Sequence, residues 1–191
     1  AKTGDKLGLA SANNLAKSKD ATAEKAGVAQ SYVTYAAVTF DGKGKISSCM
    51  LDAVQVNVGF DASGKVTSDL TAVTKTKNEL GASYGMKGAS GIGKEWNEQA
   101  NALCAYVIGK TIDQVKGIAV NEKGAPTEKE LSASVTVGIG GYVAAIEKAV
   151  ANAQSLGAKT GDKLGLASAN NIAKSKDATA EKAGVAQSYV T

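Results

Sequence analysis

Residues 88–94 read Gly-Ala-Ser-Gly-Ile-Gly-Lys, which has the spacing of the GxxxxGK part of a phosphate-binding loop. In such a loop, backbone N–H groups and the lysine hold the phosphates, and a following Ser or Thr binds magnesium. The residue that follows here is Glu95, whose carboxylate would repel phosphates. Residues 81–87 do not form the buried strand that should precede the loop. We therefore interpret the segment as a Gly-rich lead-in to a helix that begins near Gly93.

General acid–base chemistry lacks its usual residue, because the chain contains no His. Ser and Thr are frequent, but no base that could activate them can be identified from spacing. The carboxylate pair Glu128 and Glu130 lies at an expected helix start, where acidic residues favour the helix dipole. We therefore predict that the protein is not an enzyme and has no metal or cofactor.

Nucleic-acid binding is also disfavoured by the composition. All 22 basic residues are Lys, so bidentate recognition of guanine or phosphate by Arg is impossible. The net charge of +4 is spread along the chain among Asp and Glu residues, which is typical of a solvated surface. No apolar run approaches the roughly 18 residues of a membrane span, so we expect no span in this chain.

The two cysteines, Cys49 and Cys104, are too few and too far apart for a metal site. They are either small buried hydrophobic residues or, in an oxidising compartment, a disulfide. At period two, Cys49 points away from the face that carries Ile46 and Met50. We therefore expect two free thiols.

The elements that must position these residues divide into strands and then helices. Alternating apolar residues predict strands at 6–18, 27–41, 45–60 and 65–70, with Asp-Gly and Ser-Gly turns after the second and third. Helical spacing predicts helices at 93–108, 111–116 and 141–156, ended by Gly109, Gly117 and Gly157, and Thr127 with Glu130 predicts a capping box. The chain is therefore expected to be α+β, an antiparallel meander of about four strands with helices packed on one face.

The most specific signal is an internal repeat, because residues 158–191 copy residues 1–34 with the single change of Leu15 to Ile172. We therefore define 1–157 as one complete α+β repeat and 158–191 as the first β-hairpin of the next. A lone hairpin is marginal in water. We expect it to join another copy by exchange or strand addition, or to fold back on its own domain.

Residues 132–137, Ser-Ala-Ser-Val-Thr-Val before an Ala-rich helix, and the hairpin 35–51 resemble bacterial domains that bind FMN through a Ser-Gly-Ala-Thr-x-Thr motif. The resemblance implies flavin-motif positions at Ser132, Ser134 and Thr136. The family attaches the flavin phosphate to the last Thr of the motif, and Val137 stands at that position here. We therefore expect a related fold without covalent FMN.

Residues 75–99 are similar to a block in uncharacterised surface or lipoprotein-like repeats of Gram-positive bacteria. Within this block, Tyr84, Met86 and Trp96 either line a ligand pocket or cover the end of the sheet. The resemblance implies a secreted or cell-surface location. Together with the repeat, it predicts a structural tandem-repeat protein that assembles with other copies of itself into a fibre or stalk. The alternative is an extracellular flavin- or small-ligand-binding domain linked to electron transfer.

Overall fold

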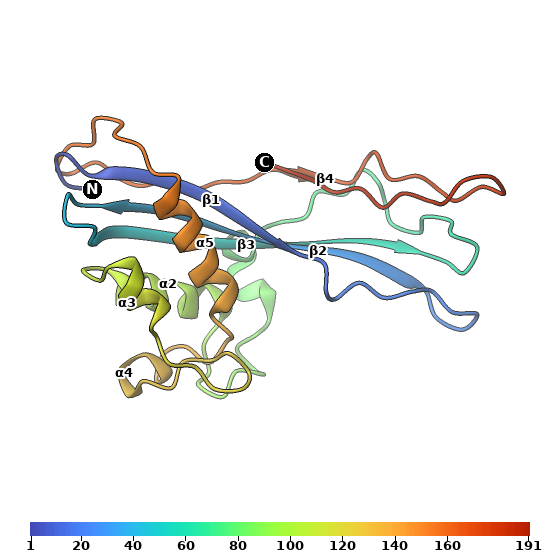
Figure 1. Cartoon of the computed structure of the whole chain (residues 1–191). Coiled ribbons are helices and arrows are strands. Elements are labelled where there is room, and N and C mark those ends of the chain that lie inside the picture. The colour runs from blue at the N-terminus through green and yellow to red at the C-terminus, as the bar shows by residue number, and fades with distance from the viewer. The chain divides into compact units, whose positions relative to one another are not determined.

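Three antiparallel strands form the main sheet in the order β1 (Lys6–Asn14), β2 (Gly27–Phe40), β3 (Ile46–Phe60), as Figure 1 shows. They belong to a computed structural model that describes residues 1–191. The α+β class and the meander predicted from the sequence are confirmed. The apolar alternation that predicted these strands reflects burial, since Val54, Val56 and Val58 are each at most 2% exposed.

The chain divides into two compact units, and each of the three strands contributes residues to both. We call the first the helical lobe; it contains Ala1–Ala12, Thr34–Ala53 and Lys77–Leu166. We call the second the strand lobe; it contains Asn13–Val33, Val54–Thr76 and Ala167–Thr191.

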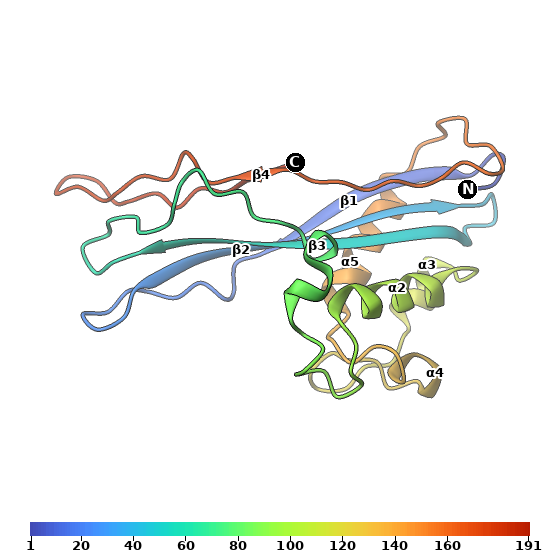
Figure 2. The same ribbon diagram turned by 180° about the vertical axis from the view of Figure 1, so that it is seen from behind.

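The helical lobe contains all of the helices: α1 (Lys77–Leu80), the 3₁₀ turn η1 (Gly81–Tyr84), α2 (Trp96–Val107), α3 (Ile112–Lys116), α4 (Lys129–Ser132) and α5 (Gly140–Ala151). Helices α2 and α5 pack on the sheet, α2 against β3 and α5 against β1 (Figures 1 and 2). Gly8 on β1 faces α5. Strand alternation places its neighbour Leu7 on the opposite face, where residues 156–164 help to line a cavity of about 150 Å³.

Several helix boundaries differ from the predicted ones, most clearly the start of α2, the cap of α4 and the end of α5. Helix α2 begins at Trp96 because Gly93 has a φ of +64°, outside the helical region. The predicted capping box of Thr127 and Glu130 is wrong: the N-cap of α4 is Glu128, and it makes no side-chain capping bond. Thr127 instead donates its N–H to the carbonyl of Ala119, 3.0 Å away.

Helix α5 was expected to continue to residue 156, and this boundary is also wrong, because the helix ends at Ala151. The backbone of Gln154 pairs instead with Leu7 on β1, through two hydrogen bonds of 2.9 Å. Gly157 does adopt the left-handed conformation, with a φ of +77°, but it lies beyond the helix.

The strand lobe has no helix. Its second sheet pairs β4 (Asn170–Asn171) antiparallel with β5 (Tyr189–Val190). The fourth strand predicted at residues 65–70 is reduced to a single bridge between Val66 and Phe60. The ladder stops there because the N–H of Gly59 donates to the Ser68 hydroxyl, 2.8 Å away, instead of to a backbone carbonyl.

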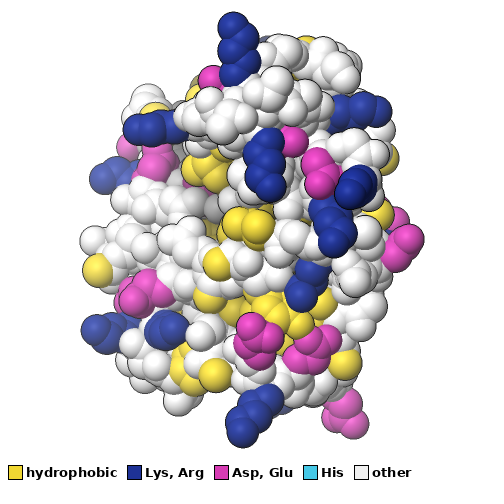
Figure 3. All heavy atoms as spheres, turned by 90° about the vertical axis from the view of Figure 1, so that its left-hand side faces the viewer, with side chains coloured by type: hydrophobic (Ala, Val, Ile, Leu, Met, Phe, Trp, Pro, Cys, Tyr) yellow, Lys and Arg dark blue, Asp and Glu magenta, His cyan; other side chains and the backbone are white.

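Charged side chains of both signs are interspersed on the surface face shown in Figure 3, as the sequence pattern predicted. No helix is long and apolar enough to cross a membrane.

Candidate functional site

The Gly-rich segment and the Ser/Thr segment come together in the helical lobe around Gln99, which is fully buried on α2. Its Oε1 accepts hydrogen bonds from the N–H of Thr136 (2.9 Å) and the N–H of Val137 (3.3 Å). Its Nε2 donates to the Ser90 hydroxyl (3.1 Å) and to the Lys94 carbonyl (3.4 Å). Gln99 therefore joins two loops by satisfying buried backbone groups in both.

The three flavin-motif positions are hydrogen-bonded within the protein. Lys94 Nζ donates to the Ser134 hydroxyl at 3.3 Å, and the Thr136 hydroxyl donates to Gln99 Oε1 at 3.3 Å. The Ser132 hydroxyl donates to the carbonyl of Lys129 within α4 at 3.5 Å. Through these contacts, Ser134 and Thr136 connect the loop before α5 to Lys94 of the Gly-rich segment and to Gln99.

Of the three pocket candidates, Trp96 is buried in the core and Tyr84 lies near it, with Lys77 against both rings. Trp96 Nε1 donates to the Tyr142 hydroxyl at 2.8 Å. The Lys77 ammonium lies 4.4 Å from the centre of the Tyr84 ring and 5.3 Å from that of Trp96. Met86 is half-buried, and its N–H donates to the Glu95 carboxylate at 2.9 Å.

Lys77 is only 6% exposed, and its burial lowers the pKa of the ammonium to about 8. The two aromatic faces act in the opposite direction, since they attract the charged form. Burial also raises the pKa of the Tyr84 hydroxyl, helped by Tyr142 and the Glu95 carboxylate. Sequence reasoning missed Lys77 because it stands in a run of polar residues, which usually indicates a solvated surface.

The two cysteine thiols are free and adjacent. Cys49 on β3 lies next to Cys104 on α2, and the interaction of the two thiols, together with burial, raises the pKa of the Cys49 thiol. The expected pair of free thiols is confirmed. The face of β3 that carries Cys49 is one that meets α2.

The copied segment makes its first contacts with its own original, in the helical lobe. The N–H of Gly4 donates to the carbonyl of Ala158 at 3.0 Å. Thr3 and Thr160, the same position in the two copies, exchange hydrogen bonds: each N–H donates to the other's hydroxyl, at 3.2 and 3.1 Å.

In the strand lobe, residues 170–178 lie antiparallel along residues 64–74 (Figure 1). At one end, Asn170 accepts from the Thr74 N–H (3.3 Å) and donates to the Thr74 carbonyl (2.6 Å). At the other end, the Ala178 N–H donates to the Gly64 carbonyl (3.0 Å). Beside it, Asp177 Oδ1 accepts from the Val66 N–H (2.7 Å). We call residues 64–74 the acceptor segment.

The same sequence position has two environments in the strand lobe. Leu15 in the first copy is 61% exposed, whereas Ile172 in the second copy is 5% exposed. Asn13 accepts from the Ser31 hydroxyl at 2.9 Å, whereas its counterpart Asn170 is used by the acceptor segment. The two copies therefore differ in the burial of one apolar side chain and in the hydrogen-bond partner of one Asn side chain.

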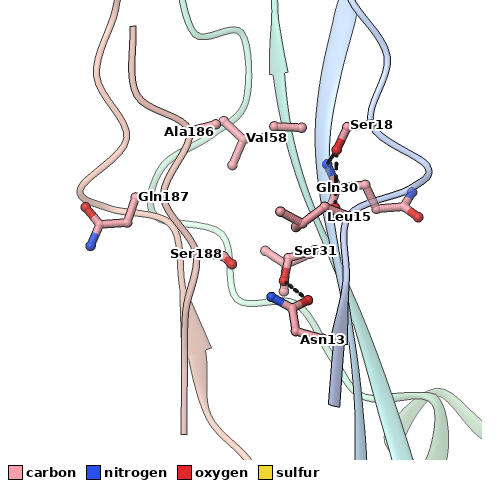
Figure 4. Close-up of a pocket in the computed structure, with 11 residues that line it drawn as sticks. Asn13, Leu15, Ser18, Gln30, Ser31, Val58, Ala186, Gln187 and Ser188 are labelled. Carbon is pink, nitrogen blue, oxygen red and sulfur yellow. Dashed lines mark hydrogen bonds between the residues drawn. The ribbon is translucent and has the colours of Figure 1, made fainter. Parts of the chain in front are cut away.

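Identical segments of the two copies line opposite sides of a cavity of about 270 Å³, which Figure 4 shows. Asn13, Leu15, Gln30 and Ser31 lie on one side, and Gln187 and Ser188, the copies of Gln30 and Ser31, lie on the other. The second copy thus lies next to the first without filling the space between them.

Comparisons with known protein families, with curated proteins and with solved structures found no match to this chain.

Proposed function

We propose that this chain is a structural tandem-repeat unit of a secreted or cell-surface bacterial protein, in which each repeat is joined to the preceding one by its own opening hairpin. The observation that carries the proposal is the docking of residues 170–178 on the acceptor segment, because 170–178 is the opening sequence of the next repeat.

The contact supports strand addition between repeats. The acceptor segment follows β3 and is tied to it by the bridge from Val66 to Phe60. The copied residues 170–178 then bind the other side of the acceptor segment. In a longer array, this order would place residues 13–21 of each repeat, the end of β1 and the loop after it, beside the acceptor segment of the repeat before it. A head-to-tail contact extends into a fibre or stalk when its rotation does not close into a ring, and an open array is the arrangement that we propose.

The bacterial surface location is proposed from the resemblance of residues 75–99 to surface repeats. A stalk function also agrees with the composition, since catalysis by His is impossible and the charges of both signs are spread along the chain.

The flavin- or ligand-binding alternative is less well supported by the contacts. The hydroxyls of Ser134 and Thr136 and the amide of Gln99 already bond one another or their neighbours. A ligand using them would have to replace these bonds, each of which contributes roughly 1 kcal/mol.

Amide hydrogen exchange with mass spectrometry tests the proposed connection. Asn170→Ala removes the acceptor of the Thr74 N–H, and we expect this amide to exchange roughly tenfold faster, as the loss of about 1.4 kcal/mol implies. Asn13→Ala is the matched control, because it changes the same position in the first copy and breaks only the bond to Ser31.

The connection would be refuted by unchanged Thr74 exchange in Asn170→Ala, or by wild-type Thr74 exchanging as fast as an unfolded chain. The array itself is tested by joining several repeats at the natural 157-residue spacing. Negative-stain electron microscopy should then show stiff rods whose length grows with repeat number, and freely jointed beads would count against a stalk.

A further inference from the structure

The first copy carries the same face as the docked second copy but makes no hydrogen bond to an acceptor segment, and its Asn13, Leu15 and Ser18 line the cavity of about 270 Å³ opposite residues 186–188. Leu15 is 61% exposed, and Asn13 and Asp20 beside it are also exposed. Their counterparts Asn170 and Asp177 hold the acceptor segment by hydrogen bonds, and Ile172, which lies between them in the sequence, is buried. We call residues 13–21 the open docking face.

The open docking face already has the conformation of the docked copy. Lys19 and Val28 exchange backbone hydrogen bonds of 2.8 and 2.9 Å, and Lys176 and Val185 do so at the same distances. The Ser18 hydroxyl accepts from the Gln30 N–H at 3.0 Å, as Ser175 does from Gln187. Binding would therefore require little ordering of the backbone, which removes a large entropic cost of association.

We propose that the open docking face binds the acceptor segment of a second copy of this chain, so that separate chains join head to tail. Leu15 takes the position of Ile172, Asp20 accepts from the N–H of Val66 in the second chain, and Asn13 leaves Ser31 to bond Thr74 of that chain. The inference rests on the proposed function, because it transfers the contact within one chain to a contact between chains.

Residues 170–178 of the same chain compete with the open docking face of a second chain for the acceptor segment. Residues 170–178 cover the acceptor segment of their own chain. A covalently attached segment competes at an effective concentration of the order of millimolar. The wild-type chain is therefore monomeric at lower concentration, and it associates once its own copy is released.

The experiment releases the copy in the full-length chain. Ile172→Asp places a carboxylate at a position that is 5% exposed when docked, and a buried unpaired charge is strongly disfavoured. Amide exchange at Val66 and Thr74 reports the release, and sedimentation velocity across a concentration series reports association. We expect faster exchange in dilute solution and concentration-dependent head-to-tail oligomers at high concentration.

A second substitution tests which surface makes these oligomers. Leu15→Asp combined with Ile172→Asp should return the chain to monomer, because the docking face then carries a charge in both copies. Val120→Asp combined with Ile172→Asp is the control, since Val120 is a 48% exposed apolar residue outside the docking face. That variant should still associate.

The proposal is overturned if Ile172→Asp is released yet stays monomeric, or if the variant with Leu15→Asp associates as strongly as the one with Val120→Asp. It is also overturned if Ile172→Asp leaves the exchange of Val66 and Thr74 unchanged. Ile172 would then not hold the acceptor segment, and Leu15, which occupies the same position in the first copy, would have no reason to do so. If the proposed function is wrong, the amides of the acceptor segment already exchange rapidly in the wild-type chain. That result is distinct from all of these outcomes, which are measured on the variants.

Discussion

Gly8 and Gly165 occupy the same position in the two copies, so the chain contains a control for its own substitution. A Cβ on Gly8 would lie 1.8 Å from the carbonyl oxygen of Ala149 on α5 and 2.6 Å from its carbonyl carbon. A Cβ on Gly165 would meet nothing within 4 Å. Neither glycine has a positive φ, so Ala is compatible with both backbones and only the contact differs.

The loss of stability in Gly8→Ala depends on which parts of the structure must move to make room for the Cβ. Cβ contacts under 3.0 Å essentially do not occur, so β1 and the end of α5 would have to separate. The blocking atoms are backbone, and a rotamer change cannot relieve the overlap. Separation would loosen Ala145, Ile146 and Ala149, all fully buried on α5. Overpacking of this kind costs roughly 1–3 kcal/mol, and we expect about 3 for Gly8→Ala.

Thermal unfolding followed by circular dichroism measures the difference. A loss of about 3 kcal/mol lowers Tm by roughly 6–12 °C in a chain of this size. Gly165→Ala should stay within about 0.5 kcal/mol of wild type, as substitutions at open surface positions do. The packing of β1 on α5 would be refuted if Gly8→Ala unfolded at the wild-type temperature, or if Gly165→Ala were equally destabilised.

Two further predictions concern buried titratable groups in the helical lobe. Lys77 has a folded-state pKa of about 8 against an ordinary value of 10.5. Between these two values the unfolded chain binds more protons than the folded chain, so the free energy of unfolding should rise with pH. Relative to Lys77→Met, the rise should reach up to about 3 kcal/mol across this window when it is measured by urea denaturation. A difference between the two proteins that does not change with pH would contradict the burial of Lys77. The adjacent thiols of Cys49 and Cys104 should be joined by a mild disulfide-forming oxidant such as diamide, which is itself reduced. Peptide mapping should find this disulfide within single wild-type chains. If oxidation gave only intermolecular disulfides, the two thiols would not be adjacent.

Features that depend on neighbouring residues could be predicted from the sequence. The α+β class, strands β1 to β3 and helices α2 and α5 follow from apolar periodicity, which reports which face of each element is buried. The left-handed turns at Gly44 and Gly64 follow from local turn chemistry.

The environment of individual side chains could not be predicted in this way. The burial of Lys77 beneath two aromatic rings and the role of Gln99 depend on segments that meet only in the folded chain. Gln99 did leave a signal, because it lies three residues after Trp96 on the apolar stripe of α2. For Lys77, a charged residue in a polar run gave no such signal.

The two copies separate what the sequence determines from what the tertiary structure decides. The repeated sequence determines the local hairpin, since residues 15–30 and 172–187 make corresponding hydrogen bonds in both places. The tertiary structure decides that Asn170 is 8% exposed and bonds Thr74, whereas the identical Asn13 is exposed and bonds Ser31. Local bonds depend only on residues near in sequence, which are the same in both copies. Burial depends on whether a distant segment, here residues 64–74, lies against the copy, and a nearly identical sequence cannot specify that difference.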